Sequence, residues 1–298
     1  MNDDSALAYG SARAMEKVVT ATTTIQLKHG KVRVCSEGPE NGPVVLWIHG
    51  ATYPLEVFSL LTPAFIEQGY RCIRYDLYGR ANSQWDSCPL TTGVLAEQAL
   101  EVLEYFEIES KVHVITLSNS DLIANVFARR YPSKVETVSW IAPSGTDRRT
   151  MNAFFRTANL IPGMDSFMSL FMKPYLIQRM GSHRKHLAPE PAKLAGPIYD
   201  IAVKSLKENP QATKAATNYF LNLPTKEAVE VDLVGLDAAH IPVMMILFGE
   251  EKDANENDLN LFRHHIRPTE VYVEGADHMG LLEKPEAILP HLLQFTVN

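Results

Sequence analysis

Short runs of apolar residues recur along most of the chain and predict buried β-strands. The continuous runs occupy residues 44–48, 72–75, 112–117, 138–142, 243–248 and 271–273. A strand that is apolar without alternation has both faces covered, which is typical of a parallel sheet between two layers of helices. Residues 22–27 and 31–35 instead alternate around His29-Gly30, and this pattern predicts a β-hairpin.

Segments with the apolar spacing of a helix separate these runs. They cover residues 60–68 and 91–106 and the stretch 122–127, where leucine, isoleucine, valine and phenylalanine share one face. Strand and helix therefore alternate, and connections between parallel strands need such helical crossovers. The pattern predicts an α/β fold with a central, mostly parallel sheet and flanking helices.

The alternation stops between about residues 148 and 236. This segment has no strand-like run, but it is rich in methionine and aromatic residues and has helical stretches at 198–206 and 212–221. Because the strand pattern resumes beyond it, we predict a helical lid, residues 148–236, inserted into a core made of residues 1–147 and 237–298. An independent helical domain is the alternative interpretation.

Composition and charge exclude several classes of protein. The 298 residues are 46% hydrophobic and 21% charged, the balance of a globular chain. The net charge of −7 argues against a nucleic-acid partner. The three cysteines have neither an even count nor a metal-ligand spacing, so no disulfide framework is expected. No apolar run approaches the roughly 18–20 residues of a membrane span, and residues 1–10 lack the apolar core of a signal peptide. We therefore expect a reduced, cytoplasmic location.

Ser118 stands where the apolar run 112–117 ends and a helical pattern begins. A sharp strand–turn–helix corner strains a serine and lifts its hydroxyl above the edge of a sheet. Such a corner needs small residues two positions before and after the serine, and Thr116 and Ser120 provide them. Centring the corner on Ser120 would put Leu122 in a position that has no room for it. The pattern therefore predicts Ser118 as the nucleophile.

Five motifs in sequence order resemble those of the α/β-hydrolase family, and together they span most of the chain. They are His49-Gly50, the segment 76–83 (Asp-Leu-Tyr-Gly-Arg-Ala-Asn-Ser), the corner at Ser118, the segment 249–253 (Gly-Glu-Glu-Lys-Asp) and the segment 275–278 (Gly-Ala-Asp-His), with Glu283 and Pro285 downstream. Some positions depart from the family pattern. Thr116 and Ser120 replace glycines, Leu117 replaces a histidine, Ala81 replaces a glycine, and Asp121 stands where another glycine is common.

The resemblance implies a catalytic triad of Ser118, Asp253 and His278, in the chain order that this fold uses. A serine hydroxyl needs a neighbouring imidazole to accept its proton. The imidazole in turn needs a carboxylate that orients it and stabilises its charged form. The loop that carries the acid is one residue longer than usual, which leaves Glu251 as an alternative to Asp253. Asp147, after the run 138–142, is a third candidate.

The same resemblance implies an oxyanion hole and a substrate pocket. By register, the N–H of Asn119 and that of Ala51 or Thr52 would hold the oxyanion. A lid must cover a cleft, and methionine-rich walls suit an adaptable apolar pocket. The residues expected to line it are His49, Phe155, Met168, Met172 and Met279. His49 is expected to act as a structural hydrogen-bonding group rather than as a catalyst.

No metal or other cofactor is expected. His183 and His186 share a helical segment and His264 adjoins His265, but no further ligand falls at a suitable spacing from either pair. The predicted function is a serine hydrolase that cleaves a carboxylic ester, thioester or lactone of a largely apolar small molecule through an acyl-enzyme. Acyl transfer, cyclisation or lyase chemistry at the same triad is an alternative, and a binding module with slow or absent turnover is another.

Overall fold

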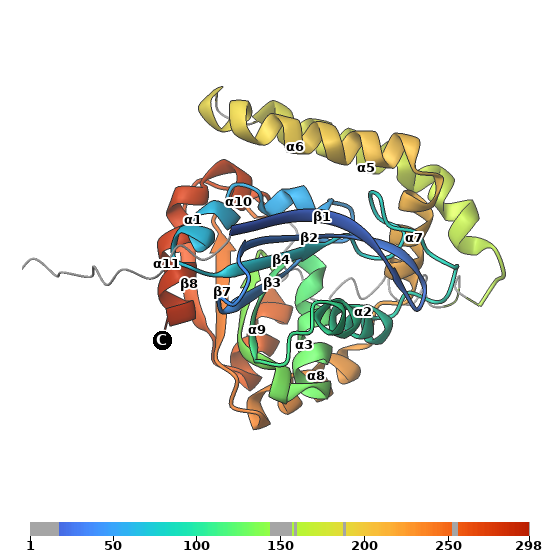
Figure 1. Cartoon of the computed structure of the whole chain (residues 1–298). Helices are drawn as coiled ribbons and strands as arrows, with labels where there is room; N and C mark the ends of the chain where they lie inside the picture. The colour runs from blue at the N-terminus through green and yellow to red at the C-terminus, as the bar shows by residue number, and fades with distance from the viewer. Residues whose placement is uncertain (1–17, 144–156, 158–159, 187–188, 252–255, 298) are drawn as a thin grey trace, which may run out of the picture.

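The computed structural model describes residues 18–143, 157, 160–186, 189–251 and 256–297. An eight-stranded sheet in the order β1-β2-β4-β3-β5-β6-β7-β8 forms its centre (Figure 1). The strands are β1 (Val18–Leu27), β2 (Gly30–Pro39), β3 (Val44–Ile48), β4 (Arg71–Tyr75), β5 (Val112–Leu117), β6 (Val135–Ile141), β7 (Val243–Phe248) and β8 (Thr269–Val273). Strand β2 runs antiparallel to β1 and β4, and the other pairs are parallel. The predicted α/β class and mostly parallel sheet are confirmed.

The position of each strand explains its residue pattern. All residues of β3 and β5, which pair with each other in the middle of the sheet, are buried. Both faces of these strands are covered by helices, so an unbroken apolar run is the stable solution. Strands β1 and β2 form the predicted hairpin at one edge, and there Val32 and Val34 point into the core while the residues between and before them are more exposed.

Helices cover both faces of the sheet. The α-helices are α1 (Thr62–Glu67), α2 (Thr92–Tyr105), α3 (Asp121–Arg130), α5 (Met164–His186), α6 (Pro189–Glu208), α7 (Pro210–Leu221), α8 (Lys226–Ala238), α9 (Glu256–His265), α10 (Gly280–Glu283) and α11 (Pro285–Val297), with 3₁₀ turns η1 (Leu55–Phe58), η2 (Ser118–Ser120) and η3 (Pro132–Lys134). One core cluster packs α2, α3, α8 and α9 against the sheet. A second cluster on the other face includes α1, α10 and α11 together with parts of α5 and α6.

Helices α5 to α8 follow one another between β6 and β7, in the part of the chain where strands are not predicted. Helices α5 and α6 lie side by side along the top of Figure 1, above the edge of the sheet. Helix α8 lies on the opposite side and packs against α3, with Val229, Leu233 and Leu236 inside the first core cluster. The predicted lid of residues 148–236 therefore includes a helix that packs as part of the core, and its boundaries remain a prediction.

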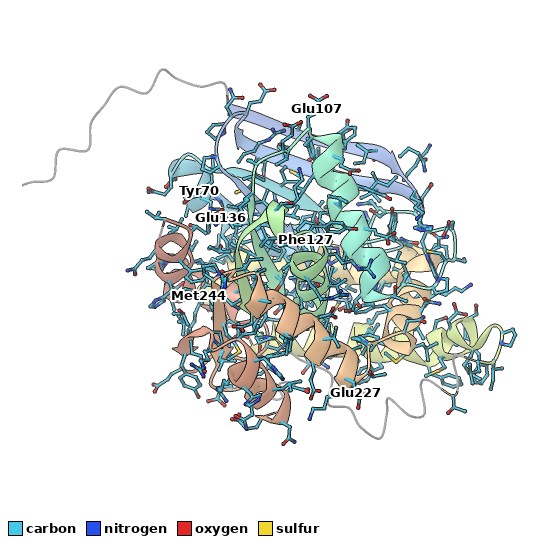
Figure 2. The ribbon with its side chains drawn as sticks, turned by 90° about the horizontal axis from the view of Figure 1, so that it is seen from below. Tyr70, Glu107, Phe127, Glu136, Glu227 and Met244 are labelled. Carbon is cyan, nitrogen blue, oxygen red and sulfur yellow. The ribbon has the colours of Figure 1, made fainter. Side chains whose placement is uncertain are left out.

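Helix α3 packs its apolar side chains into the interior of the molecule. Figure 2 shows Phe127 of α3 in the middle of the molecule, where its side chain is fully buried, while Glu107 and Glu227 lie at the margins. In the described part of the chain, no helix combines the length and the hydropathy that a membrane crossing requires.

Candidate active site

A sharp corner joins β5 to α3 and carries Ser118. The backbone of Ser118 has a φ of +58°, in the left-handed region that side-chain-bearing residues rarely adopt. The loop after β3 approaches the corner closely: a Cβ on Gly50 would lie 3.3 Å from the Cβ of Ser118. The hydroxyl of Ser120 donates to the carbonyl of His49 at 2.5 Å and connects the two segments. The predicted corner is thus present, with Ser118 at its tip.

Ser118 and His278 lie within hydrogen-bond distance. The Nε2 atom of His278, on the loop after β8, is 3.0 Å from the Oγ of Ser118. Its Nδ1 atom is 2.5 Å from Oε2 of Glu251, on the loop after β7. The side chains of His278 and Glu251 are largely buried. The three groups form the hydrogen-bonded chain that proton abstraction from a serine requires.

The carboxylate beside His278 belongs to Glu251, the alternative to Asp253. Asp253 and Asp147 lie outside the described residues. Two backbone hydrogen bonds hold the loop of Glu251 against the loop of His278: Gly249 N–H donates to the Val273 carbonyl, and Glu250 N–H donates to the Ala276 carbonyl, both at 2.9 Å. These bonds bring Glu251 to the imidazole of His278, so Glu251 is the candidate acid among the described residues, and the role expected of Asp253 stays a prediction.

The loop that carries His278 is stabilised by its own neighbours. Asp277 N–H donates to Oε2 of Glu283 at 3.0 Å, and Oδ1 of Asp277 accepts from Met279 N–H at 2.9 Å. Gly275 has a φ of +64°, a conformation that glycine adopts without a steric cost. These contacts fix the backbone on both sides of His278, and they explain the role of the downstream Glu283.

The predicted oxyanion residues Asn119, Ala51 and Thr52 all line a cavity of about 70 Å³ next to Ser118. The carbonyls of the peptides that contain the Ala51 and Thr52 N–H groups accept hydrogen bonds. The Gly50 carbonyl accepts from His49 Nδ1 at 2.7 Å, and the Ala51 carbonyl accepts from Arg80 Nε at 3.2 Å. In a trans peptide the N–H points opposite to the carbonyl. The N–H groups of Ala51 and Thr52 therefore point away from His49 and Arg80.

The peptide that follows Ser118 is held in the same way. The carbonyl of Ser118 accepts from Asp121 N–H, so the N–H of Asn119 is directed to the opposite side. The carbonyl of Asn119 accepts from the hydroxyl of Tyr219 at 2.8 Å. The arrangement can present backbone donors to a developing oxyanion, and α3 begins directly behind it.

Solved structures resemble this architecture over nearly the whole chain. A hydrolase from Pseudomonas aeruginosa PA01 aligns with 17% identity and a TM-score of 0.70 over 92% of this chain and 98% of that one. A structure from work on carboxylesterases of the thaumarchaeon Nitrososphaera gargenis aligns with 18% identity and a TM-score of 0.68 over 92% of this chain and 98% of that one. A thermophilic esterase from Thermogutta terrifontis aligns with 17% identity and a TM-score of 0.68 over 94% of this chain and 98% of that one. This chain has an α/β-hydrolase fold. No protein-family model matches the sequence, and the search of curated proteins gives no match.

Within the α/β-hydrolase fold, His49 is structural. It is fully buried, its Nε2 accepts from Leu77 N–H at 2.9 Å, and its Nδ1 donates to the Gly50 carbonyl. Burial lowers the pKa of His49 to about 3, so the ring is neutral at physiological pH. Both ring nitrogens form hydrogen bonds within the protein, and His49 is not among the residues that line the cavity beside Ser118, where it is also expected.

The other predicted pocket residues occupy different positions in this α/β-hydrolase fold. Met279 lines the cavity. Met168 packs beside Leu221, Met172 packs at the margin of the second core cluster, and neither lines the cavity. Phe155 lies outside the described residues. Which methionines face the site depends on how α5 packs against the core.

Several cavity residues were missed by sequence reasoning. They are Tyr53, Leu117, Leu176, Arg179, Met180 and Phe220. Leu176, Arg179 and Met180 stand at helical spacing on α5, so their common face was a usable signal. Arg179 makes the cavity less apolar than predicted. Its charge opposes the rise in the pKa of Tyr53 that burial causes, which reflects the proximity of the two side chains.

Proposed function

We propose that the protein is a serine hydrolase that cleaves a carboxylic ester, thioester or lactone through an acyl-enzyme. The observation that carries the proposal is the continuous chain from Ser118 Oγ to His278 Nε2, at 3.0 Å, and from His278 Nδ1 to Glu251, at 2.5 Å. The names of the structural neighbours, a hydrolase, carboxylesterases and an esterase, also support a hydrolytic reaction.

In the proposed mechanism, His278 accepts the proton of Ser118 as Oγ attacks the carbonyl carbon of the substrate. Glu251 accepts a hydrogen bond from Nδ1 and stabilises the imidazolium that forms. The N–H of Asn119 and that of Ala51 or Thr52 hold the oxyanion of the tetrahedral intermediate. His278 then protonates the leaving group. Water, deprotonated by the same imidazole, hydrolyses the acyl-enzyme and restores Ser118.

The cavity wall supports a substrate with an apolar portion and a polar or anionic substituent. Leu176, Met180, Phe220 and Met279 contribute apolar surface, and Arg179 contributes a guanidinium group. Arginine binds carboxylate through paired hydrogen bonds, and an apolar pocket wall strengthens such an interaction by excluding water. The proposed substrate is therefore a small ester or thioester whose apolar part carries an acidic group away from the scissile bond.

Labelling with a fluorophosphonate probe, read by mass spectrometry of the intact protein, tests the proposal. The wild type should gain one adduct, and Ser118→Ala should gain none. Ser120→Ala is the matched control, because its hydroxyl donates to the carbonyl of His49 rather than to the imidazole of His278, and it should still be labelled. Adduct formation that persists in Ser118→Ala would overturn the assignment. Absence of labelling in the wild type would favour a binding function.

Hydrolysis, acyl transfer and cyclisation all share an acyl-enzyme and differ in the group that accepts the acyl chain. Once screening has found a substrate, an isotope experiment identifies that acceptor. Turnover in ¹⁸O-labelled water should place the heavy isotope in the acid product if water is the acceptor. Turnover without incorporation of the isotope would indicate an acceptor other than water and would contradict the hydrolytic proposal while keeping the triad.

A further inference from the structure

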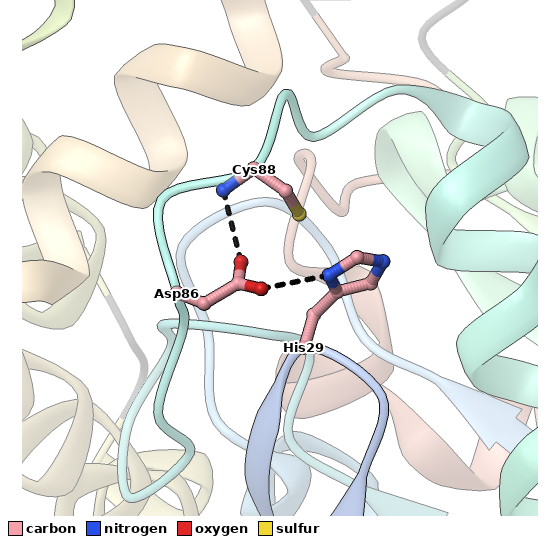
Figure 3. Close-up of side chains that lie close together, drawn as sticks. All are labelled: His29, Asp86 and Cys88. Atoms are coloured by element: carbon pink, nitrogen blue, oxygen red, sulfur yellow. Dashed lines mark hydrogen bonds and ion pairs between the residues drawn. The ribbon is translucent and has the colours of Figure 1, made fainter.

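A second cluster of chemically active side chains lies at the turn between β1 and β2. Figure 3 shows His29, from this turn, next to Asp86 and Cys88, from the segment that leads to α2. One ligand atom of each residue, a ring nitrogen, a carboxylate oxygen and the sulfur, lies within 4.8 Å of the other two. None of the three lines the cavity beside Ser118. The proposed hydrolase mechanism makes no use of them.

We propose that His29, Asp86 and Cys88 bind a zinc ion. Imidazole nitrogen, thiolate sulfur and carboxylate oxygen are the donor types that Zn²⁺ takes in proteins, at about 2.0–2.3 Å. In a tetrahedral site such donors lie about 3.5 Å apart, so a separation within 4.8 Å closes by small side-chain rotations. The His29 Nδ1 and Asp86 Oδ2 atoms, 2.9 Å apart, are already close enough to share one ion.

The backbone around the cluster is held in place without an ion. Asp86 N–H donates to the His29 carbonyl at 3.0 Å, and Oδ1 of Asp86 accepts from Cys88 N–H at 2.9 Å. Trp85 Nε1–H donates to the Cys88 carbonyl at 2.9 Å, and His29 N–H donates to the hydroxyl of Tyr78 at 3.4 Å. Preorganised ligands lose little conformational entropy when a metal binds, which favours affinity.

An ion can reach the cluster from solvent. The Asp86 side chain is half exposed, and Asp86 and Gly30 form part of the wall of an open groove of about 940 Å³. Three protein ligands leave a fourth position for water on the side of this groove. When the ion binds, the Cys88 thiol loses its proton to solvent and a Zn–S bond forms, with no change of oxidation state.

The cluster is unsuited to a second nucleophilic centre. Burial, with a contribution from the Asp86 carboxylate, raises the pKa of the Cys88 thiol to about 11, whereas a reactive cysteine needs a lowered one. The Nδ1 of His29 is occupied by Asp86. A bound cation offsets the effect of burial and of the Asp86 carboxylate and so stabilises the Cys88 thiolate. The same cation would join the β1–β2 turn to the segment before α2, which contacts the helical insertion. Gln211 of α7 donates to the Trp85 carbonyl at 2.9 Å in that segment.

Metal titration of the full-length reduced protein tests the proposal. Wild-type protein should bind one Zn²⁺ by calorimetry, and Cys88→Ser should bind it at least about tenfold more weakly. Co²⁺ as a spectroscopic probe should give a near-ultraviolet thiolate-to-cobalt band in the wild type that is absent in Cys88→Ser. His264→Gln is the control, because His264 is an exposed residue that lies beside His265 and outside the cluster, and it should bind like the wild type.

The thermal unfolding of metal-free protein distinguishes loss of a ligand from loss of the fold. Metal-free wild type and Cys88→Ser should unfold at similar temperatures, and zinc should raise the transition of the wild type alone. Equal Zn²⁺ affinity in wild type and Cys88→Ser would overturn the proposal. Loss of binding in His264→Gln in place of Cys88→Ser, or a cobalt complex of the wild type without a thiolate band, would do the same.

Discussion

Ser118 occupies a backbone conformation that a serine maintains only when its neighbours constrain it. Its φ of +58° places the hydroxyl at the tip of the corner, facing the Nε2 of His278. The contact of Ser120 with the carbonyl of His49 and the close approach of Gly50 supply the constraint. The small side chains at 116 and 120, although not glycine, are therefore compatible with a functional corner.

At the residue scale, the identity of the acid is the first prediction. Glu251→Gln should lower kcat by about 10³–10⁴-fold, because an amide can donate to Nδ1 and stabilise the wrong tautomer of His278. Asp253→Asn, which removes the same charge two positions along the chain, should leave kcat essentially unchanged. Steady-state kinetics on the best ester substrate measures both variants. A large loss in Asp253→Asn with an active Glu251→Gln would return the acid role to Asp253.

Arg179 leads to a prediction about specificity. If its guanidinium binds an acidic group of the substrate, Arg179→Met should lower kcat/KM for an anionic ester by about 10–100-fold relative to a neutral ester of the same size. Arg179→Lys should retain part of the preference. The rate of fluorophosphonate labelling should not change, because the triad is intact. An unchanged ratio between the two esters in Arg179→Met would contradict anion recognition.

At the scale of elements, the helices between β6 and β7 divide into two groups by what they cover. Helices α5 and α7 contribute Leu176, Arg179, Met180 and Phe220 to the wall of the cavity. Helix α8 contributes to the core cluster beneath the sheet and packs against α3. Its side chain Asp232 also forms an ion pair with Arg129 of α3, with a 2.5 Å separation between Oδ1 and Nε.

The position of α8 can be tested by two neighbouring substitutions. Leu233 is fully buried and Val234 is 53% exposed. Leu233→Ala should lower the free energy of unfolding by about 2–5 kcal/mol, because it leaves a cavity in the core. Val234→Ala should change it by no more than about 0.5 kcal/mol. Urea denaturation measures both, and similar effects of the two substitutions would contradict the packing of α8 as a core helix.

At the scale of the whole molecule, the site depends on segments that are far apart in the chain. The corner of Ser118 follows β5, in the middle of the sheet, and Glu251 and His278 lie on the loops after β7 and β8, beyond the helical insertion. Global unfolding therefore separates Ser118, Glu251 and His278 completely. Conditions that destabilise the sheet should abolish activity in parallel with structure.

Acid should destabilise the molecule partly through His49. Its pKa is about 3 in the folded protein, against an ordinary value of 6.5, so the unfolded chain binds one more proton between these values. The contribution of His49 to stability is thus complete above about pH 6.5. It is lost as the pH falls toward 3, by at most about 1.4 kcal/mol per pH unit.

Urea denaturation between pH 7 and pH 4.5 measures this effect. His49→Gln, which keeps a donor and an acceptor, should show a shallower loss of stability with falling pH than the wild type. His264→Gln removes an exposed histidine and should show the wild-type slope. Equal slopes for His49→Gln and the wild type would contradict a neutral, buried imidazole at position 49.

Local pattern determined a large part of this molecule. Unbroken apolar runs such as 44–48 and 112–117 predict buried parallel strands, because a side chain that faces a helix layer on either side of a sheet must be apolar. The corner at Ser118 could be located because it adjoins such a strand, and His278 could be located because the segment 275–278 resembles a motif of the α/β-hydrolase family. Their spacing to the strand ends is a property of neighbouring residues in the chain.

Tertiary structure decided what depends on contacts between distant segments. Glu251 meets His278 because hydrogen bonds join the loops after β7 and β8, and no sequence spacing records that alignment. His29 lies beside Asp86 and Cys88 because the β1–β2 turn folds onto the segment before α2. Side chains on one helix or strand follow a fixed period, whereas the angle and register at which elements pack are set by the combined shape of the core.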